Sequence, residues 1–198
     1  MYISQINIDN QIRTAKRALS SPQVMHAIIE KCFETSEKKL WRLDGSKLLV
    51  VSDNIPSDPD TALQLSDSPI QTKNYDLYLS RIKEGERFRF RLTANPVRCI
   101  PDETNGNKRG KVVAHVTPEH QMNWLHCRAK KLGFEIDSLT LKSSEFVKFH
   151  KGGHDVTLKL ATFEGVLSIK DAEIMLNTMK TGIGRGKAYG AGLITLAC

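Results

Sequence analysis

The order of the predicted elements indicates an α+β protein with two consecutive ferredoxin-like, or RRM-like, βαββαβ units. Short segments alternate between apolar and polar residues, which is typical of half-buried strands, and longer segments carry the apolar stripe of a helix. Both halves of the chain give the order strand, helix, strand, strand, helix, strand. With 198 residues, 40% of them hydrophobic, the chain can form one large or two small domains. We expect two, at residues 1–96 and 97–198.

The first half begins with a predicted strand and a predicted helix. Ile6 and Ile8 alternate with polar residues, which predicts a strand. Ser21 followed by Pro22 is typical of a helix start, because serine can cap free amides and proline tolerates the first helical position. Five apolar residues then fall on one face of the predicted helix: Met25, Ile28, Ile29, Cys32 and Phe33.

Two strands, a loop and a last strand follow in the first half. Residues 40–43 and 48–51 flank Asp44 and Gly45, which predicts a hairpin. Residues 53–69 contain three prolines and many Ser and Asp residues, so we expect a loop with at most a short helix near residues 61–65. Apolar residues alternate with arginines at 87–92, which predicts a strand with one apolar and one basic face.

The second half repeats this order. Residues 111–116 are a possible strand, and Thr117 with Pro118 begins a predicted helix that Gly133 ends. Two long predicted strands, residues 139–149 and 156–169, flank the glycine pair 152–153, which reads as a hairpin tip. Asp171 caps a second predicted helix. A glycine-rich segment and a strand at residues 193–196 complete the unit.

Composition limits the environment and the partners. The net charge is +7, which suits a protein that neutralises phosphates, although many basic proteins bind no nucleic acid. No segment has the roughly 18 apolar residues of a membrane span, and the first residues lack the pattern of a signal peptide. We therefore expect a soluble, cytoplasmic protein with no membrane partner. The four cysteines are scattered, which predicts neither a disulfide framework nor a cysteine zinc site.

Residues 182–192 hold five glycines, with Arg185 and Lys187 between them. The segment is not a Walker loop, because Thr181 occupies the first glycine position and Ala188 stands where Ser or Thr must reach magnesium. Glycines allow backbone amides to approach a phosphate closely, and two cations can neutralise it. We expect phosphate or RNA contact at Gly184, Arg185, Gly186 and Lys187. The alternative is a tight turn between a helix and a strand.

Three further clusters of basic residues are candidates for RNA contact. The first lies in a loop rich in Gly and Asn, the second on the helix that follows Pro118, and the third beside the predicted hairpin tip. Their members are Lys108, Arg109 and Lys111; Arg128, Lys130 and Lys131; and Lys148 and Lys151. A basic two-stranded hairpin is a plausible probe of an RNA groove. The alternative for each cluster is ordinary solvated surface.

His26 lies about 20° beyond the apolar stripe of the first predicted helix, at 100° per residue. Such a boundary position can face a cleft. Imidazole exchanges protons near neutral pH, which suits cleavage of RNA by its 2′-hydroxyl. The alternative is a surface or packing residue. The other histidines at 115, 120 and 126 lack the spacing of metal ligands, and we expect no metal site.

Several of these segments together resemble the CasE family, the CRISPR repeat endoribonucleases of type I-E systems. The resemblance rests on residues 88–96 (Phe-Arg-Phe-Arg-Leu-Thr-Ala-Asn-Pro), Trp124 with Leu125, residues 163–167 (Phe-Glu-Gly-Val-Leu), and the glycine-rich segment through Leu196. It implies two ferredoxin-like domains that bind the repeat hairpin of precursor CRISPR RNA and cut at the 3′ base of its stem. The implied products are a 2′,3′-cyclic phosphate and a 5′-hydroxyl, made without metal or cofactor. The enzyme is then expected to stay on the mature crRNA as a subunit of Cascade.

The resemblance also assigns roles to individual residues. The family's catalytic histidine falls on His26, as general acid or base, and Lys31 could neutralise charge on the scissile phosphate. The basic helix, the hairpin and the glycine-rich segment are the family's RNA-contacting elements. One departure stands out: some relatives carry a tyrosine where this chain has Gln23, and glutamine cannot transfer a proton at neutral pH.

Two other functions remain open from the sequence. The first is a non-catalytic RNA-binding scaffold that retains the fold and the basic surfaces, and Gln23 is its support. The second is an enzyme that binds a small phosphorylated ligand at the glycine-rich segment, and it predicts competition by nucleotides.

Overall fold

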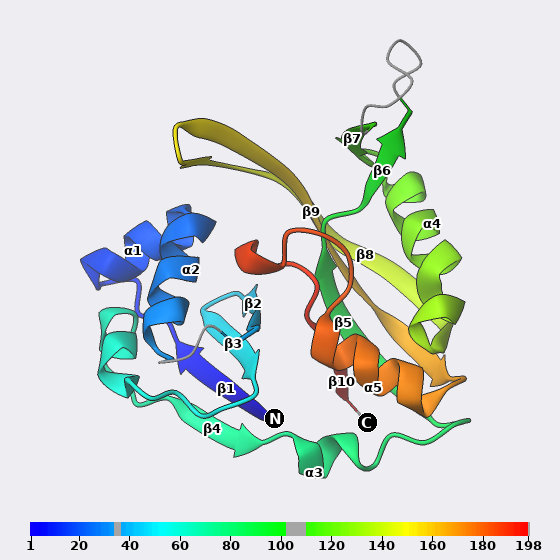
Figure 1. Ribbon diagram of the computed structural model, residues 1–198, viewed down its shortest axis with the longest axis horizontal. Coiled ribbons are helices and arrows are strands. Elements are labelled where there is room, and N and C mark those ends of the chain that lie inside the picture. The colour runs from blue at the N-terminus through cyan, green and yellow to red at the C-terminus, as the bar shows by residue number, and fades with distance from the viewer. Residues whose placement is uncertain (34–36, 102–109, 198) are drawn as a thin grey trace.

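A computed structural model describes residues 1–33, 37–101 and 110–197, and it contains two four-stranded antiparallel sheets (Figure 1). The strand orders are β2-β3-β1-β4 and β10-β5-β9-β8. In both sheets the first and third strands lie in the centre and the second and fourth at the edges, which is the ferredoxin-like arrangement. The predicted tandem ferredoxin-like fold is therefore confirmed.

The first sheet carries two helices on one face. Its strands are β1 (Tyr2–Asn7), β2 (Leu40–Asp44), β3 (Lys47–Ser52) and β4 (Gln71–Asn74). The helices are α1 (Arg13–Ser20) and α2 (Pro22–Lys31), and the predicted apolar stripe of α2 is buried throughout. Ser21 is the N-cap residue of α2, but its side chain makes no capping hydrogen bond. Burial raises the pKa of the Cys32 thiol to about 11, so this thiol stays protonated at neutral pH.

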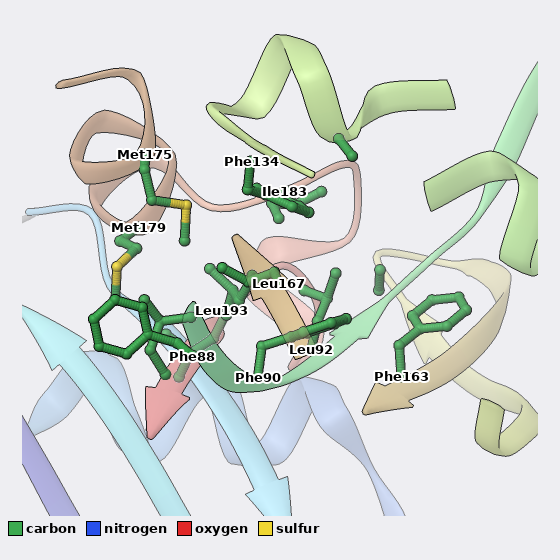
Figure 2. Close-up of a cluster of buried hydrophobic side chains, with 14 of the residues drawn as sticks. Phe88, Phe90, Leu92, Phe134, Phe163, Leu167, Met175, Met179, Ile183 and Leu193 are labelled. Carbon is green, nitrogen blue, oxygen red and sulfur yellow. The ribbon is translucent and has the colours of Figure 1, made fainter. Parts of the chain in front are cut away.

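The second sheet carries the larger core. Its strands are β5 (Arg87–Ala94), β8 (Phe134–Lys151), β9 (His154–Ile169) and β10 (Ile194–Ala197), and one face is covered by α4 (Pro118–Ala129) and α5 (Ala172–Thr181). Figure 2 shows that apolar side chains of β5, among them Phe88 and Phe90, pack in one cluster with Met175 and Met179 of α5. As predicted, Asp171 caps α5, because its carboxylate accepts a hydrogen bond from the Ile174 amide at 2.9 Å.

The assignment of the strand at residues 87–92 to the first unit is wrong. This strand, β5, pairs with β9 and β10, so the division between the two sheets lies between β4 and β5 and not at residues 96 and 97. The strand predicted at residues 111–116 is β7 (Lys111–Ala114), which among the described residues pairs only with β6 (Val97–Ile100), in a separate ribbon. Alternation reveals which face of a strand is buried but not which strand it pairs with, and the pattern alone therefore misplaced β5.

The remaining elements are short. They are the 3-10 helices η1 (Pro59–Gln64), η2 (Lys130–Leu132) and η3 (Lys187–Tyr189), and the one-turn helix α3 (Asp76–Leu79). The long strands β8 and β9 extend beyond the sheet as a ribbon that curves toward α1 and α2 in Figure 1. This ribbon carries the predicted hairpin tip at Gly152 and Gly153, and it brings the second unit over the helices of the first.

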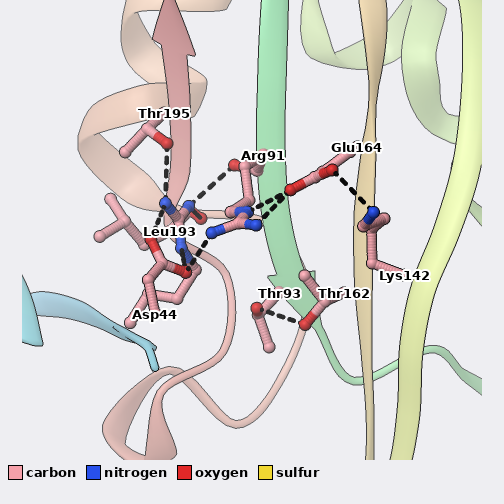
Figure 3. Close-up of polar contacts among 9 residues, drawn as sticks. Asp44, Arg91, Thr93, Lys142, Thr162, Glu164, Leu193 and Thr195 are labelled. Atoms are coloured by element: carbon pink, nitrogen blue, oxygen red, sulfur yellow. Dashed lines mark hydrogen bonds and ion pairs between the residues drawn. The ribbon is translucent and has the colours of Figure 1, made fainter. Parts of the chain in front are cut away.

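A buried arginine joins the two sheets. Arg42 of β2 is 2% exposed and donates hydrogen bonds to the carbonyl oxygens of Arg91 at 2.8 Å and Leu193 at 3.1 Å. The same guanidinium donates to Thr195 Oγ1 at 2.9 Å and binds Asp44 through two nitrogens, at 2.9 and 2.7 Å. Asp44 is also 3.3 Å from Arg91, which continues to Glu164 (Figure 3). This network fixes how the first sheet sits against β5 and β10.

Candidate RNA-cleavage site

His26 lies on α2 where this helix meets the glycine-rich segment at residues 182–192. Its side chain is 28% exposed, and its Nδ1 is 3.7 Å from Glu30 Oε1, one turn further along the helix. Glu30 in turn accepts a hydrogen bond from Lys39 at 3.0 Å. The Tyr189 ring stands edge-on to the imidazole, with 6.1 Å between ring centroids and 71° between planes. His26 is therefore accessible and flanked by groups from distant parts of the chain.

The glycine-rich segment reaches α2 because Trp41 of β2 anchors it. Trp41 Nε1 donates a hydrogen bond to the Ala188 carbonyl at 3.2 Å. Gly190 has a φ of +82°, and a Cβ atom there would stand 2.8 Å from the Trp41 ring, so only glycine fits. The Gly192 amide also donates to the Thr93 carbonyl of β5 at 2.7 Å. These contacts place Lys187 and Tyr189 beside α2.

The ammonium groups of Lys187, in this segment, and Lys38 lie close to each other. Burial, and then the nearby charge of Lys38, lowers the pKa of the Lys187 ammonium. Two close like charges repel each other, and an anion between them relieves that repulsion. A phosphate is a group of the right charge for this position. The predicted phosphate-binding role of Lys187 thus gains a second cation, Lys38, which no sequence pattern singles out.

The hairpin of β8 and β9 closes over the same region. Phe149 of β8 packs on Tyr189 with 4.5 Å between ring centroids, and Lys151 donates a hydrogen bond to the Tyr189 hydroxyl at 2.7 Å. Lys148 is exposed on the same strand. The predicted hairpin and the predicted glycine-rich segment therefore form one continuous surface with His26.

A second basic site lies at the opposite end of the glycine-rich segment. Arg98 of β6, Arg128 of α4 and Arg185 line a pocket of about 210 Å³, which we call the arginine pocket. The Arg128 guanidinium lies 4.4 Å above the Trp124 ring and donates to the Trp124 carbonyl at 2.9 Å. Burial, and then the charges of Arg98, His120 and Arg128, lowers the pKa of neighbouring His115, which reflects how much positive charge converges here.

The other described candidate residues do not line the arginine pocket. Lys31 is exposed at the end of α2, about 140° around the helix from His26 at 100° per residue, so the structure does not bring the two together. Lys130 and Lys131 are exposed in η2, and Lys111 is exposed on β7. Lys108 and Arg109 lie outside the described residues.

Three functional candidates escaped the sequence analysis: Arg98, Lys38 and Tyr189. Arg98 sits in a short strand with no clear alternation, and Lys38 precedes β2 in an unremarkable charged run. Tyr189 lies inside the glycine-rich segment, but nothing in the local pattern shows that it meets α2. Their neighbours come from other elements: Arg98 lines a pocket with Arg128 of α4, and Tyr189 meets α2.

Neither a metal cluster nor a membrane span is found in the part of the chain that the structure describes. No three His, Cys, Asp or Glu side chains there come together in a way that could hold a metal ion. None of the helices there combines the length and the apolar character needed to cross a membrane. Independence of metal stays a prediction, which chelation tests directly.

Comparison with known proteins gives consistent matches over the whole chain. A family profile described as "CRISPR associated protein" matches residues 1–198. The CRISPR-associated endoribonuclease Cse3 of Thermus thermophilus is 29% identical over 100% of both chains. The CRISPR system Cascade subunit CasE of Escherichia coli (strain K12) is 29% identical over 78% of this chain and 75% of that protein.

A solved structure extends the likeness to three dimensions. Thermus thermophilus Cse3 bound to an RNA representing a pre-cleavage complex has a TM-score of 0.81 and 28% identity to this chain, and the match covers 100% of this chain and 98% of that one. The family profile, the Thermus relative and its solved structure match along the whole chain, and the Escherichia coli relative matches over 78% of it. The chain belongs to the CRISPR associated protein family.

Proposed function

We propose that the protein is an endoribonuclease that binds the hairpin of CRISPR repeat RNA and cleaves precursor CRISPR RNA at the 3′ base of the stem. The observation that carries this proposal is the meeting of an accessible histidine, His26, with a basic hairpin and a glycine-rich segment that brings Lys187. The name of the Thermus relative, an endoribonuclease, and its RNA-bound structure support the same reaction. The RNA is made inside the cell, so the proposed place of action is the cytoplasm.

The proposed chemistry needs only groups of the protein and the RNA. The 2′-hydroxyl oxygen attacks the adjacent phosphorus, the bond from phosphorus to the 5′-oxygen breaks, and a 2′,3′-cyclic phosphate and a 5′-hydroxyl result. His26 acts as general acid or base, which typically contributes 10²- to 10⁴-fold. Lys187 and Lys38 are better placed than Lys31 to neutralise charge on the phosphate, because Lys31 lies on another face of α2.

Analysis of the product ends tests this proposal. A type I-E repeat hairpin RNA incubated with the protein should yield a fragment with a 2′,3′-cyclic phosphate, which ligation resists until acid opens the ring, and a fragment with a 5′-hydroxyl. The upstream fragment should stay bound to the protein during gel filtration. Tight binding with no cleavage of this RNA or of the host's own repeat would instead support the non-catalytic scaffold, the reading that Gln23 favours.

The expected retention of the cleaved RNA implies further partners. The Escherichia coli relative is named a subunit of Cascade, and we propose the same membership for this chain, with the mature crRNA and other Cascade subunits as partners. Co-purification of the protein with crRNA and other subunits from its own host tests this membership.

The hairpin lysines should supply part of the RNA affinity. Replacing Lys148 and Lys151 by alanine should weaken binding of a 2′-deoxy, uncleavable hairpin RNA. It should also make the negative slope of log K against log salt concentration shallower by about 1.4 to 1.8, since each phosphate contact contributes about 0.7 to 0.9. Titrations at several salt concentrations measure both effects. Unchanged affinity across the salt series would show that the hairpin is no groove probe.

The arginine pocket should hold a second stretch of backbone. Arg98→Ala should reduce affinity for the same RNA and make the negative slope of log K against log salt concentration shallower by about 0.7 to 0.9, because one phosphate contact is lost. Lys73→Ala is the matched control, since Lys73 is exposed on β4 of the first sheet, away from the pocket. Equal affinities and equal slopes for both variants would remove the pocket from the RNA path.

A further inference from the structure

Tyr189 places a phenol beside His26, where the neighbouring residue on α2, Gln23, has only an amide. Gln23 precedes His26 by one turn of α2, and its Oε1 is buried without a hydrogen-bond partner among the described residues. Its amide has no proton to give at neutral pH. Tyr189 arrives from the opposite end of the chain, and its ring stands 6.1 Å from the imidazole. A phenol is thus present next to His26, on η3 and not on α2.

The position of Tyr189 is firmly set. Phe149 packs on one side of its ring at 4.5 Å between centroids. The residues on either side of Tyr189 are both held by Trp41. The Ala188 carbonyl accepts a hydrogen bond from the indole, and Gly190 lies so close to the ring that a Cβ atom would not fit. A side chain held by packing on both the first and the second unit loses little freedom when it acts, which favours a catalytic role.

The hydroxyl oxygen of Tyr189 accepts a hydrogen bond from a cation. Lys151 Nζ donates to this oxygen at 2.7 Å, and an ammonium can only donate, so the phenolic proton remains free for another acceptor. The same ammonium lies 5.4 Å from the ring centroid. Its charge stabilises the negative oxygen that results when the phenol loses its proton. Lys151 therefore acts through Tyr189 as a positioning residue.

We propose that Tyr189 is the catalytic general acid that works with His26 in the cleavage of CRISPR repeat RNA. This inference rests on the endoribonuclease function proposed above. The His26 imidazole takes the proton of the 2′-hydroxyl as the new bond to phosphorus forms. Tyr189 gives its proton to the 5′-oxygen as the bond from phosphorus to that oxygen breaks, and Lys151 stabilises the phenolate. The imidazolium then releases its proton to water, and the phenolate takes one back.

A modified substrate separates this role from a structural one. Tyr189→Phe keeps the ring contacts with His26 and Phe149 and removes only the hydroxyl. It should bind hairpin RNA like the wild type but cleave it about 10²-fold more slowly in single-turnover assays. In an RNA with sulfur in place of the departing 5′-oxygen, the leaving group is a thiolate, which needs no proton. On this RNA the Tyr189→Phe variant should cleave within a few-fold of the wild type, while His26→Ala stays slow.

Each other outcome has a distinct meaning. Wild-type rates for Tyr189→Phe on ordinary RNA, or equal losses on both RNAs, would overturn the general-acid role. Tyr2→Phe is the control, because Tyr2 lies on β1 of the first sheet, between Ser52 of β3 and Asn74 of β4. This variant should match the wild type on both RNAs. If the wild type itself binds but cuts neither RNA, the endoribonuclease function fails, and the role of Tyr189 falls with it.

Discussion

Replacing His26 by alanine should lower the single-turnover rate constant for cleavage of the repeat hairpin by about 10²- to 10⁴-fold, the usual contribution of a general acid or base. The side chain lies beside Glu30 and Tyr189, is 28% exposed and is not one of the buried core residues, so the variant should fold and bind RNA like the wild type. Quenched-flow or manual time courses with protein in excess measure the rate, and titration with 2′-deoxy RNA measures the binding.

His126→Ala provides the matched control for this experiment. His126 is exposed on α4 and lies apart from the junction of α2 with the glycine-rich segment. We expect this variant to cleave at the wild-type rate. A His26→Ala variant that cleaves within a few-fold of the wild type would remove His26 from the chemistry, whatever its effect on binding.

Replacing Arg42 by methionine should cost about 3 to 5 kcal/mol of the free energy of unfolding, the usual cost of removing one partner of a buried ion pair. The change leaves the Asp44 carboxylate without its bidentate partner and the buried carbonyl oxygen of Leu193 without the guanidinium donor. Urea unfolding followed by circular dichroism measures the loss. The variant should also bind RNA more weakly, because the two units lose their fixed orientation.

Two controls separate this pair from ordinary charge effects. Removing both partners, with Arg42→Met and Asp44→Leu, should cost less than Arg42→Met alone, since no buried charge is left unpaired. Lys170→Ala breaks an exposed pair with Glu135 and should leave the urea midpoint close to that of the wild type. An Arg42→Met variant with a wild-type midpoint would contradict the proposed role of this network.

Elements with strong periodicity were predicted well. The stripe on α2 follows from a 3.6-residue repeat. The hairpin at Asp44 and Gly45 and the two long strands follow from turn residues that separate apolar segments. Weakly patterned elements were missed: α1 buries only Ala15 and Ala18, and β4 is a polar edge strand. β5 was found as a strand but placed in the wrong unit, because pairing depends on the whole chain and not on the local pattern.

The candidate site shows the same limit. His26 and the glycine-rich segment could be singled out from residue type and spacing, and the resemblance to a family sharpened both. Their contact through Tyr189 could not be predicted, because it depends on the docking of the segment onto Trp41. The arginine pocket likewise combines residues of β6, α4 and the glycine-rich segment. Local sequence patterns do not predict tertiary contacts of this kind, because the residues that form them are far apart in the chain.

The most direct test is cleavage of a type I-E repeat hairpin RNA in excess EDTA. The wild type, His26→Ala, and an RNA with a 2′-deoxy group at the scissile nucleotide would be compared side by side. The proposed mechanism predicts that cleavage by the wild type survives EDTA and is lost with either change, since the 2′-hydroxyl is the nucleophile and His26 moves its proton. Cleavage that stops in EDTA and returns with added metal, or that persists on 2′-deoxy RNA, would contradict it.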